Sequence, residues 1–291
     1  MQYLLEGHGA CAVLDSTGGE LIGYQKDGVE YVWQGDPAYW AGHAPVLFPI
    51  VGALKDGSIR IGGAICNIPK HGAARKREFV MDQKADDSAV FSLRADAQSF
   101  AMYPFRFLLS VTHQLLQHGF QTTYTVKNED DRDMPFCIGG HPAFRCPLNS
   151  GEGFEDYALI FEKKETVPAI YTDGGTLINR NSAVQLMKDE NQIPLRYSDF
   201  DQDAFILDGL VSREVKLLHK TNGKGLKLSF DGFSALGVWT PPKKNAPFLC
   251  LEPWAGLPAF PDETGEFLDK PYAMVLKPGE AKHFHYAMEA L

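Results

Sequence analysis

FRFLLSVTHQLL at residues 105–116 and FQTTYTVK at residues 120–127 decide the fold class of this chain. Both runs are rich in aromatic and β-branched residues, and their apolar side chains recur at every second position, as they do along a β-strand. The link between them, residues 117–119, is short and ends in glycine. Two strand-like runs joined by a short glycine-containing link predict an antiparallel β-hairpin.

The same pattern continues on both sides of this hairpin. Further strand-like runs are residues 90–94, 157–163, 225–230 and 236–240. Gly-Gly and Asp-Gly pairs, which are typical of tight turns, separate many of the runs. Helical periodicity is confined to two short candidates, residues 96–102 and 182–188. We therefore expect antiparallel β structure with brief helices. No linker or fixed-period repeat divides the chain, so we expect one domain spanning residues 1–291.

The composition argues against several classes of partner. The 291 residues include 28 Lys plus Arg and 37 Asp plus Glu, a net charge of −9, without any long basic run. Neither nucleic acid nor an anionic membrane is therefore expected as a partner. The five cysteines form no CxxC pair, so we expect reduced thiols. The sequence begins without a basic and apolar leader and has no apolar run of membrane-spanning length, which predicts a cytoplasmic location.

Two histidines have neighbours that restrict the backbone. His141 lies between a pair of glycines and Pro142, so the chain can approach other groups closely while His141 stays extended. A cleft histidine fits this pattern, and so does a buried histidine whose ring is bonded to the backbone. His71 precedes Gly72 on a predicted loop or strand end, where it is a candidate to reach a cleft. A surface histidine is the simpler interpretation for His71.

A lone carboxylate ends an apolar run, FLCLEPW, at residues 248–254. Burying Glu252 without partners would cost several kcal/mol or raise its pKa, and a carboxylate kept in such a place is a candidate general base. Trp254 beside it is a candidate aromatic wall for a sugar. The alternative is a glutamate at a strand end that reaches solvent.

Signals for metals and cofactors are weak. His283 and His285 would share one face of a terminal strand, where a solvated or packed strand is the simpler interpretation. A zinc site made from His71, His141 and Glu252 is compatible with the residue types, but no HExxH spacing supports it. The sequence contains no P-loop, no GxGxxG and no GxSxG motif, so we expect neither a cofactor nor a serine nucleophile.

In their order along the chain, these motifs resemble the aldose 1-epimerase (galactose mutarotase) family, and in particular its LacX-like branch. The resemblance covers nearly the whole chain. The stretches that carry it are EYVWQGDP (30–37), LFPIVG (47–52), KHGAAR (70–75), GHPAF (140–144), LEPW (251–254) and KPGE (277–280).

This resemblance implies a large single-domain antiparallel β-sandwich with a concave sugar-binding face. It also implies interconversion of the α and β anomers of an aldose, without a cofactor or a metal. Glu252 would take the proton of the anomeric hydroxyl, and His141 would protonate the ring oxygen so that the ring opens. Rotation and reclosure would then give the other anomer. His71 would orient the sugar.

Further roles follow from the same resemblance. Asp203 corresponds to an acidic residue that binds sugar hydroxyls, although Asp199 and Asp201 lie close enough in sequence to compete for that position. Because His141 must be protonated while Glu252 is ionised, we expect a bell-shaped dependence of rate on pH.

One departure from the family concerns the substrate. Many relatives have an arginine that contacts the sugar where this chain has Ala53. Lys55 and Arg75 are candidates to replace it, and Arg75 is therefore counted among the predicted sugar-binding residues.

Three other functions stay open at this stage. A non-catalytic sugar-binding or sugar-sensing protein can have the same fold. An epimerase of sugar phosphates would need a cationic cluster, for which the candidates are Lys70, Arg75, Lys76 and Arg77. A metal hydrolase is the most distant alternative. The sequence leaves open which aldose is used and whether the protein is a monomer or a homodimer.

Overall fold

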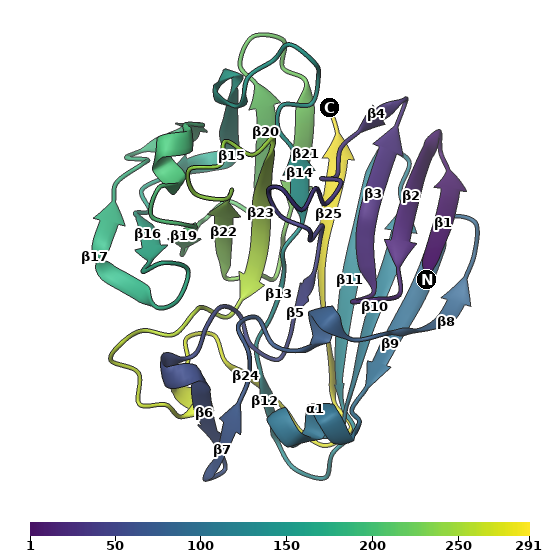
Figure 1. Cartoon of the computed structure of the whole chain (residues 1–291), viewed down its shortest axis with the longest axis vertical. Coiled ribbons are helices and arrows are strands. Elements are labelled where there is room, and N and C mark those ends of the chain that lie inside the picture. Colours follow the sequence, from purple (N-terminus) through teal and green to yellow (C-terminus); the bar gives the residue numbers. More distant parts are fainter.

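Antiparallel β-strands make up most of the chain, and the computed structural model describes all of residues 1–291 (Figure 1). The hairpin predicted near residue 117 is present as β10 (Phe107–Leu115) and β11 (Gly119–Asn128), which pair along their whole length. Buried residues alternate with more exposed ones along β10. One face of the hairpin therefore packs on the core, as the sequence pattern predicts.

This hairpin belongs to a nine-stranded sheet. β25 (Ala281–Ala290) lies between β11 and β21 (Gly225–Ser229) and joins two groups of four strands. In Figure 1, β25 is the yellow strand that runs through the middle of the molecule. The other strands of this sheet are β8 (Val80–Lys84), β9 (Ser88–Arg94), β15 (Tyr157–Glu165), β18 (Glu190–Pro194) and β20 (Glu214–His219).

A second large sheet carries two of the predicted site residues, Glu252 and Trp254. At its centre, β23 (Phe248–Ala255) is flanked by β22 (Ala235–Trp239) on one side and by β13 (Ile138–Gly140) and β14 (Ala143–Arg145) on the other. Its remaining strands are β5 (Val46–Leu47), β16 (Ala169–Thr172), β17 (Ile178–Val184) and β19 (Phe205–Asp208).

Smaller elements complete the fold. A four-stranded sheet contains β1 (Gln2–Gly7), β2 (Ala10–Asp15), β3 (Glu20–Lys26) and β4 (Val29–Glu30), and two further pairs are β6 (Ser58–Ile61) with β7 (Ala64–Asn67) and β12 (Met134–Phe136) with β24 (Met274–Leu276). The helices are α1 (Ala97–Met102) and the 3-10 turns η1 (Lys55–Gly57), η2 (Ala74–Lys76), η3 (Phe154–Asp156), η4 (Tyr197–Phe200) and η5 (Phe267–Asp269). None of these helices has the length and apolar composition that crossing a membrane requires.

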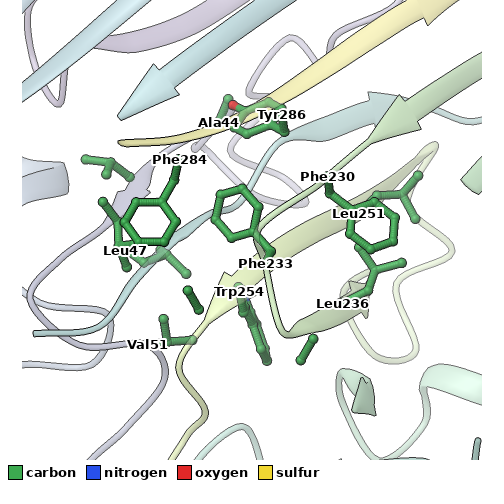
Figure 2. Close-up of a cluster of buried hydrophobic side chains, with 14 of the residues drawn as sticks. Ala44, Leu47, Val51, Phe230, Phe233, Leu236, Leu251, Trp254, Phe284 and Tyr286 are labelled. Carbon is green, nitrogen blue, oxygen red and sulfur yellow. The ribbon is translucent and has the colours of Figure 1, made fainter. Parts of the chain in front are cut away.

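The two large sheets pack face to face around a hydrophobic core of 75 residues. Figure 2 shows Phe284 and Tyr286 of β25 near Phe233, with Leu251 of β23 beside Phe230. The rings of Phe233 and Phe284 are 5.7 Å apart, measured between centroids. Interdigitating side chains from two sheets are the mark of a β-sandwich, so the predicted fold class is confirmed.

Of the two predicted helices, one is correct and one is wrong. α1 follows an Asp96 cap whose carboxylate accepts the Ser99 N–H at 2.8 Å. Residues 182–188, by contrast, continue β17 and then leave regular structure. Ser182 accepts the backbone N–H of Tyr171 on the neighbouring strand at 3.0 Å, and Val184 pairs with Ala169. Residues 182–188 have apolar side chains at helical spacing but no helix cap, so pairing with β16 determines the conformation of residues 182–184.

Candidate active site

All six predicted site residues line one cavity of about 250 Å³. They are His71, Arg75, His141, Asp203, Glu252 and Trp254. Ligand pockets in proteins are commonly about 300–1,000 Å³, so this cavity is at the small end and suits one sugar ring better than an oligosaccharide. The meeting of these residues in space, which only the family resemblance implied, is present in the structure.

β23 supplies Glu252 and Trp254 to one face of the second sheet, because alternate residues of a strand point the same way. The indole of Trp254 has room because glycines face it from both neighbouring strands. A Cβ added to Gly237 of β22 would lie 2.6 Å from the Trp254 ring, and one added to Gly139 of β13 would lie 2.8 Å from it. Small residues on both sides therefore let this large ring lie over the sheet.

His141 follows β13 and is held through both its backbone and its ring. Its N–H donates to the carbonyl of Pro45 at 3.1 Å, and its imidazole stacks on the indole of Trp40 with 5.0 Å between ring centroids. Its Nε2 lies 3.2 Å from Oε2 of Glu252, and neither that Oε2 nor the His141 Nδ1 has a hydrogen-bond partner. Both side chains are nearly inaccessible to solvent, so the two predicted catalytic groups are in direct, dry contact.

Burial favours the uncharged form of each member of this pair. It lowers the pKa of His141 to about 3. It also raises the pKa of Glu252 well above its usual range, an effect that Lys70 opposes and Asp203 strengthens. Burial therefore favours a neutral pair in which the proton is on Glu252 rather than on His141. The sequence-based expectation places this proton on His141, so the two arrangements differ by the position of one proton.

His71 is fixed by a turn that few residues adopt. Its φ of 66° is left-handed, its N–H donates to the carbonyl of Gly52 at 2.8 Å, and its Nδ1 accepts the Gly52 N–H at 3.2 Å. Since Nδ1 accepts, the neutral ring carries its proton on Nε2, which bonds to no protein group. Burial, together with the proximity of His141, lowers the pKa of His71 well below its usual value. His71 can therefore offer a neutral N–H donor to a ligand.

Asp203 is anchored on the opposite side of the cavity. Its Oδ1 accepts the indole N–H of Trp239 at 2.7 Å, and its Oδ2 accepts the hydroxyl of Thr172 at 3.4 Å. Asp199, which competed with it in sequence, instead forms an ion pair with Arg196 at 3.1 Å and does not line the cavity. Of the neighbouring carboxylates, Asp203 is therefore the one placed to accept hydroxyl protons from a ligand.

Two cations line the cavity without forming an ion pair. They are Lys70 and Arg75, and the guanidinium of Arg75 donates to the carbonyl of Lys70 at 3.3 Å. Burial lowers the pKa of Arg75, which the nearby carboxylate of Glu20 partly offsets. Lys55, the other candidate to replace an arginine at position 53, donates to the carbonyl of Glu263 at 3.4 Å and does not line the cavity. The suggestion that Lys55 contacts the ligand is therefore wrong.

The cavity has walls that sequence reasoning did not select. These are chiefly Trp40, Thr172, Gly175 and Trp239. Trp40 lies between the family-like stretches 30–37 and 47–52, and Trp239 lies within a predicted strand, but neither position carries a local signal for a site. Thr172 and Gly175 come from the end of β16 and the turn that follows it, and only the folded chain brings them to Asp203.

A metal could only be held here by a different set of donors from the one considered in the sequence. Donor atoms of His141, Cys250 and Glu252 lie within 4.8 Å of one another. Cys250 is fully buried and does not line the cavity. His283 and His285 are exposed on β25, as a solvated strand predicts, and His283 bonds to the Thr125 hydroxyl at 2.8 Å.

Comparison with known proteins places this geometry in a family. The profile of the family described as aldose 1-epimerase matches residues 1–289. Two proteins named LacX from Lactococcus lactis subsp. lactis, one plasmid and one chromosomal, are 36% identical to this chain in an alignment of 290 residues. The alignment covers 95% of this chain and 95% of each relative.

Solved structures agree. A galactose mutarotase related enzyme from Lactobacillus acidophilus has a TM-score of 0.93 and 28% identity, covering 100% of this chain and 97% of its own. A galactose mutarotase-like protein from Lactobacillus casei has a TM-score of 0.92 and 29% identity, covering 100% of both chains. With a family match along almost its entire length and LacX relatives above 30% identity, the chain belongs to the aldose 1-epimerase family, in its LacX-like branch.

Proposed function

We propose that this protein is an aldose 1-epimerase that interconverts the α and β anomers of a hexose or a related aldose. Membership of the family supports an isomerase acting on carbohydrates. The observation that carries the proposal is the contact of 3.2 Å between His141 Nε2 and Glu252 Oε2 in a cavity sized for one sugar ring. This contact puts one acid and one base beside each other, as a reaction at two oxygens of one carbon needs.

The proton balance of the reaction fits a pair that holds one proton. Once that proton has moved to His141, ionised Glu252 takes a proton from the anomeric hydroxyl while His141 gives its own to the ring oxygen. The bond between the anomeric carbon and the ring oxygen breaks, and the anomeric carbon becomes a carbonyl carbon. After rotation about the neighbouring carbon–carbon bond, both transfers run backwards on the other face. The pair ends the cycle with the proton count at which it began.

The other residues bind and orient the sugar in this proposal. His71 donates its Nε2–H to the ring oxygen or to a neighbouring hydroxyl, and Asp203 accepts protons from hydroxyls at the far side of the ring. Trp254, with Trp40, supports the apolar faces of the sugar. Arg75 donates to sugar oxygens in the role that family members give to the arginine missing at position 53.

Polarimetry of freshly dissolved α-glucose and α-galactose tests the proposal. The wild-type protein should accelerate the approach to equilibrium, and His141→Ala and Glu252→Gln should each lose roughly 10²–10⁴-fold of the acceleration. Glu165→Gln is the control, because Glu165 is a buried carboxylate outside the cavity. Clear sugar binding by calorimetry without any acceleration would replace the proposal with a non-catalytic sugar-binding protein.

A second candidate is an epimerase of phosphorylated sugars, which the two unpaired cations of the cavity favour. Of the four cations considered in the sequence, Lys70 and Arg75 line the cavity, whereas Arg77 forms an ion pair with Asp96 and Lys76 lies outside. Competition between glucose 6-phosphate and glucose separates the two candidates. A glucose 6-phosphate KM well below that of glucose, raised by Lys70→Met, would favour the phosphorylated substrate.

The proposal includes a cytoplasmic enzyme that needs neither nucleic acid nor a membrane. All five cysteines are free thiols, which suits a reducing compartment. Monomer or homodimer remains a prediction, and sedimentation equilibrium of the purified protein decides between them.

A further inference from the structure

One irregular segment, residues 40–45, holds His141 from outside the second sheet. Its first residue, Trp40, stacks on the His141 ring with an interplanar angle of 27°, and its last, Pro45, accepts the His141 N–H at 3.1 Å. Between them, the His43 carbonyl accepts the N–H of Ala143 at 2.8 Å. The 40–45 segment therefore sets both the ring plane and the backbone position of His141.

The 40–45 segment has no regular secondary structure, so its own N–H groups need partners from elsewhere. Glu20, on β3 of the four-stranded sheet, supplies them. Its Oε1 accepts the N–H of His43 at 2.9 Å and the N–H of Ala44 at 2.6 Å. Both N–H groups therefore converge on one oxygen of a side chain that is only 13% exposed.

We propose that Glu20 is a positioning residue for His141, acting through the 40–45 segment. It fixes the segment, and the segment fixes the imidazole at its contact distance from Glu252. The inference rests on the proposed epimerase function, because it assigns Glu20 to the geometry of that reaction. Displacing a reacting group by about 1 Å can cost 10²-fold in rate, so a residue outside the cavity can control turnover in this way.

A merely structural role is the alternative, and the fold offers a matched control for it. Glu165 of β15 also accepts two consecutive backbone N–H groups, from Val211 at 3.1 Å and from Ser212 at 2.7 Å. It is buried more completely than Glu20, but neither it nor the loop it holds lines the cavity. Removing either carboxylate should destabilise the fold, whereas only removal of Glu20 should disturb His141.

Turnover of three variants tests the inference. Glu20→Ala should lower kcat for anomer exchange by about 10- to 100-fold. Glu20→Gln should stay within about threefold of wild type, because both N–H groups bond to one oxygen, which an amide retains. Glu165→Ala should keep the wild-type kcat once circular dichroism shows that it is folded. A folded Glu20→Ala protein with wild-type kcat, or an equal loss in Glu165→Ala, would overturn the inference.

Two additions keep the test decisive. If Glu20→Ala does not fold, Glu20→Asp keeps the charge but withdraws the acceptor oxygen, and the same loss of kcat is expected.

If the wild-type protein proves inactive, the proposed function fails while the positioning contact can still be tested by nuclear magnetic resonance. Glu20→Ala or Glu20→Asp should then speed hydrogen exchange at the Ala44 amide and shift the His141 ring resonances, with Glu20→Gln leaving both in place. Unmoved His141 resonances would overturn the inference whatever the activity.

Discussion

A single proton shared by His141 and Glu252 is the smallest unit of the proposed chemistry. The pair has three protonation states. With two protons there is no base, with one proton there is an acid and a base, and with none there is no acid. Only the middle state can open the ring, so its pH range is the range of activity. That range is bounded below by the lowered pKa of His141 and above by the raised pKa of Glu252.

The pH profile of anomer exchange should therefore be a broad plateau that falls at both ends. Burial lowers the pKa of His141 to about 3, so the acid limb should lie near there. The alkaline limb should lie above the usual glutamate range, because burial raises the pKa of Glu252. Polarimetry from about pH 3 to pH 9 measures both limbs. A rate that kept rising to the alkaline end would contradict the shared proton.

Gly72 should tolerate no side chain, because it forms a parallel bridge with Phe48, the residue after β5. A Cβ there would lie 1.8 Å from the carbonyl oxygen of Phe48, and its φ of 74° is left-handed. Gly72→Ala should therefore destabilise the fold by roughly 3 kcal/mol or more, combining steric overlap with backbone strain. Gly63→Ala is the control: its φ of 84° is similar, but a Cβ there meets nothing within 4 Å. Strain alone should cost it about 1–2 kcal/mol.

Urea denaturation of both alanine variants gives the comparison, since a changed midpoint at constant slope reports a change in stability. Equal losses of stability at the two positions would show that the backbone near Phe48 can move to make room for the added methyl group.

At the scale of elements, β23 and its neighbouring strands make different contributions to the cavity. β23 supplies a carboxylate and an indole, and β22 and β13 supply glycines that leave space for the indole. An indole that lies this close to the neighbouring strands needs small residues at the matching positions. The glycines of β13 and β22 therefore shape the site although they do not line the cavity.

Gly237→Ala should raise the KM for the sugar several-fold with a smaller effect on kcat. The new methyl group would lie 2.6 Å from the Trp254 ring, so the indole has to shift within the cavity wall. Initial rates at varied sugar concentration separate the two constants. Gly232→Ala is the control, because a Cβ at this turn position before β22 meets nothing within 4 Å. An unchanged KM with an altered near-ultraviolet dichroism of tryptophan would exclude Trp254 from sugar binding.

The elements that the sequence predicts well are those specified by local pattern. The hairpin of β10 and β11 alternates strictly and has its turn glycine at position 119, so nothing distant is needed to place it. Residues 182–188 were misassigned because their conformation depends on pairing with β16, which no local pattern records. The capped helix after Asp96 was predicted correctly for the opposite reason.

The site residues also differ in whether a local sequence pattern identifies them. Glu252 and His141 stood out because a lone carboxylate or a Gly-Gly-His-Pro context is unusual within a strand. Trp239 and Thr172 did not, because their importance lies in the hydrogen bonds that they make to Asp203. Glu20 was also missed, since its partners are backbone N–H groups 23 and 24 residues away, which have no sequence signature.

At the scale of the whole molecule, one hydrophobic core connects both large sheets and most of the four-stranded sheet. The prediction of a single domain can be tested on this basis. Calorimetry should show one unfolding transition whose calorimetric and van't Hoff enthalpies agree. A separate low-temperature transition, assigned by proteolysis to residues 1–30, would contradict a single domain and indicate that the four-stranded sheet unfolds alone.

The central position of β25 also has a consequence for how the protein is made. The strands on its two sides, β11 and β21, leave the ribosome before residues 281–290 exist, and nothing else joins them within the sheet. Until then, β11 and β21 are unpaired edge strands, and unpaired edges can form hydrogen bonds with strands of other chains. Folding of the sandwich is thus delayed until synthesis has passed residue 290, and nascent chains stalled earlier should depend on chaperones.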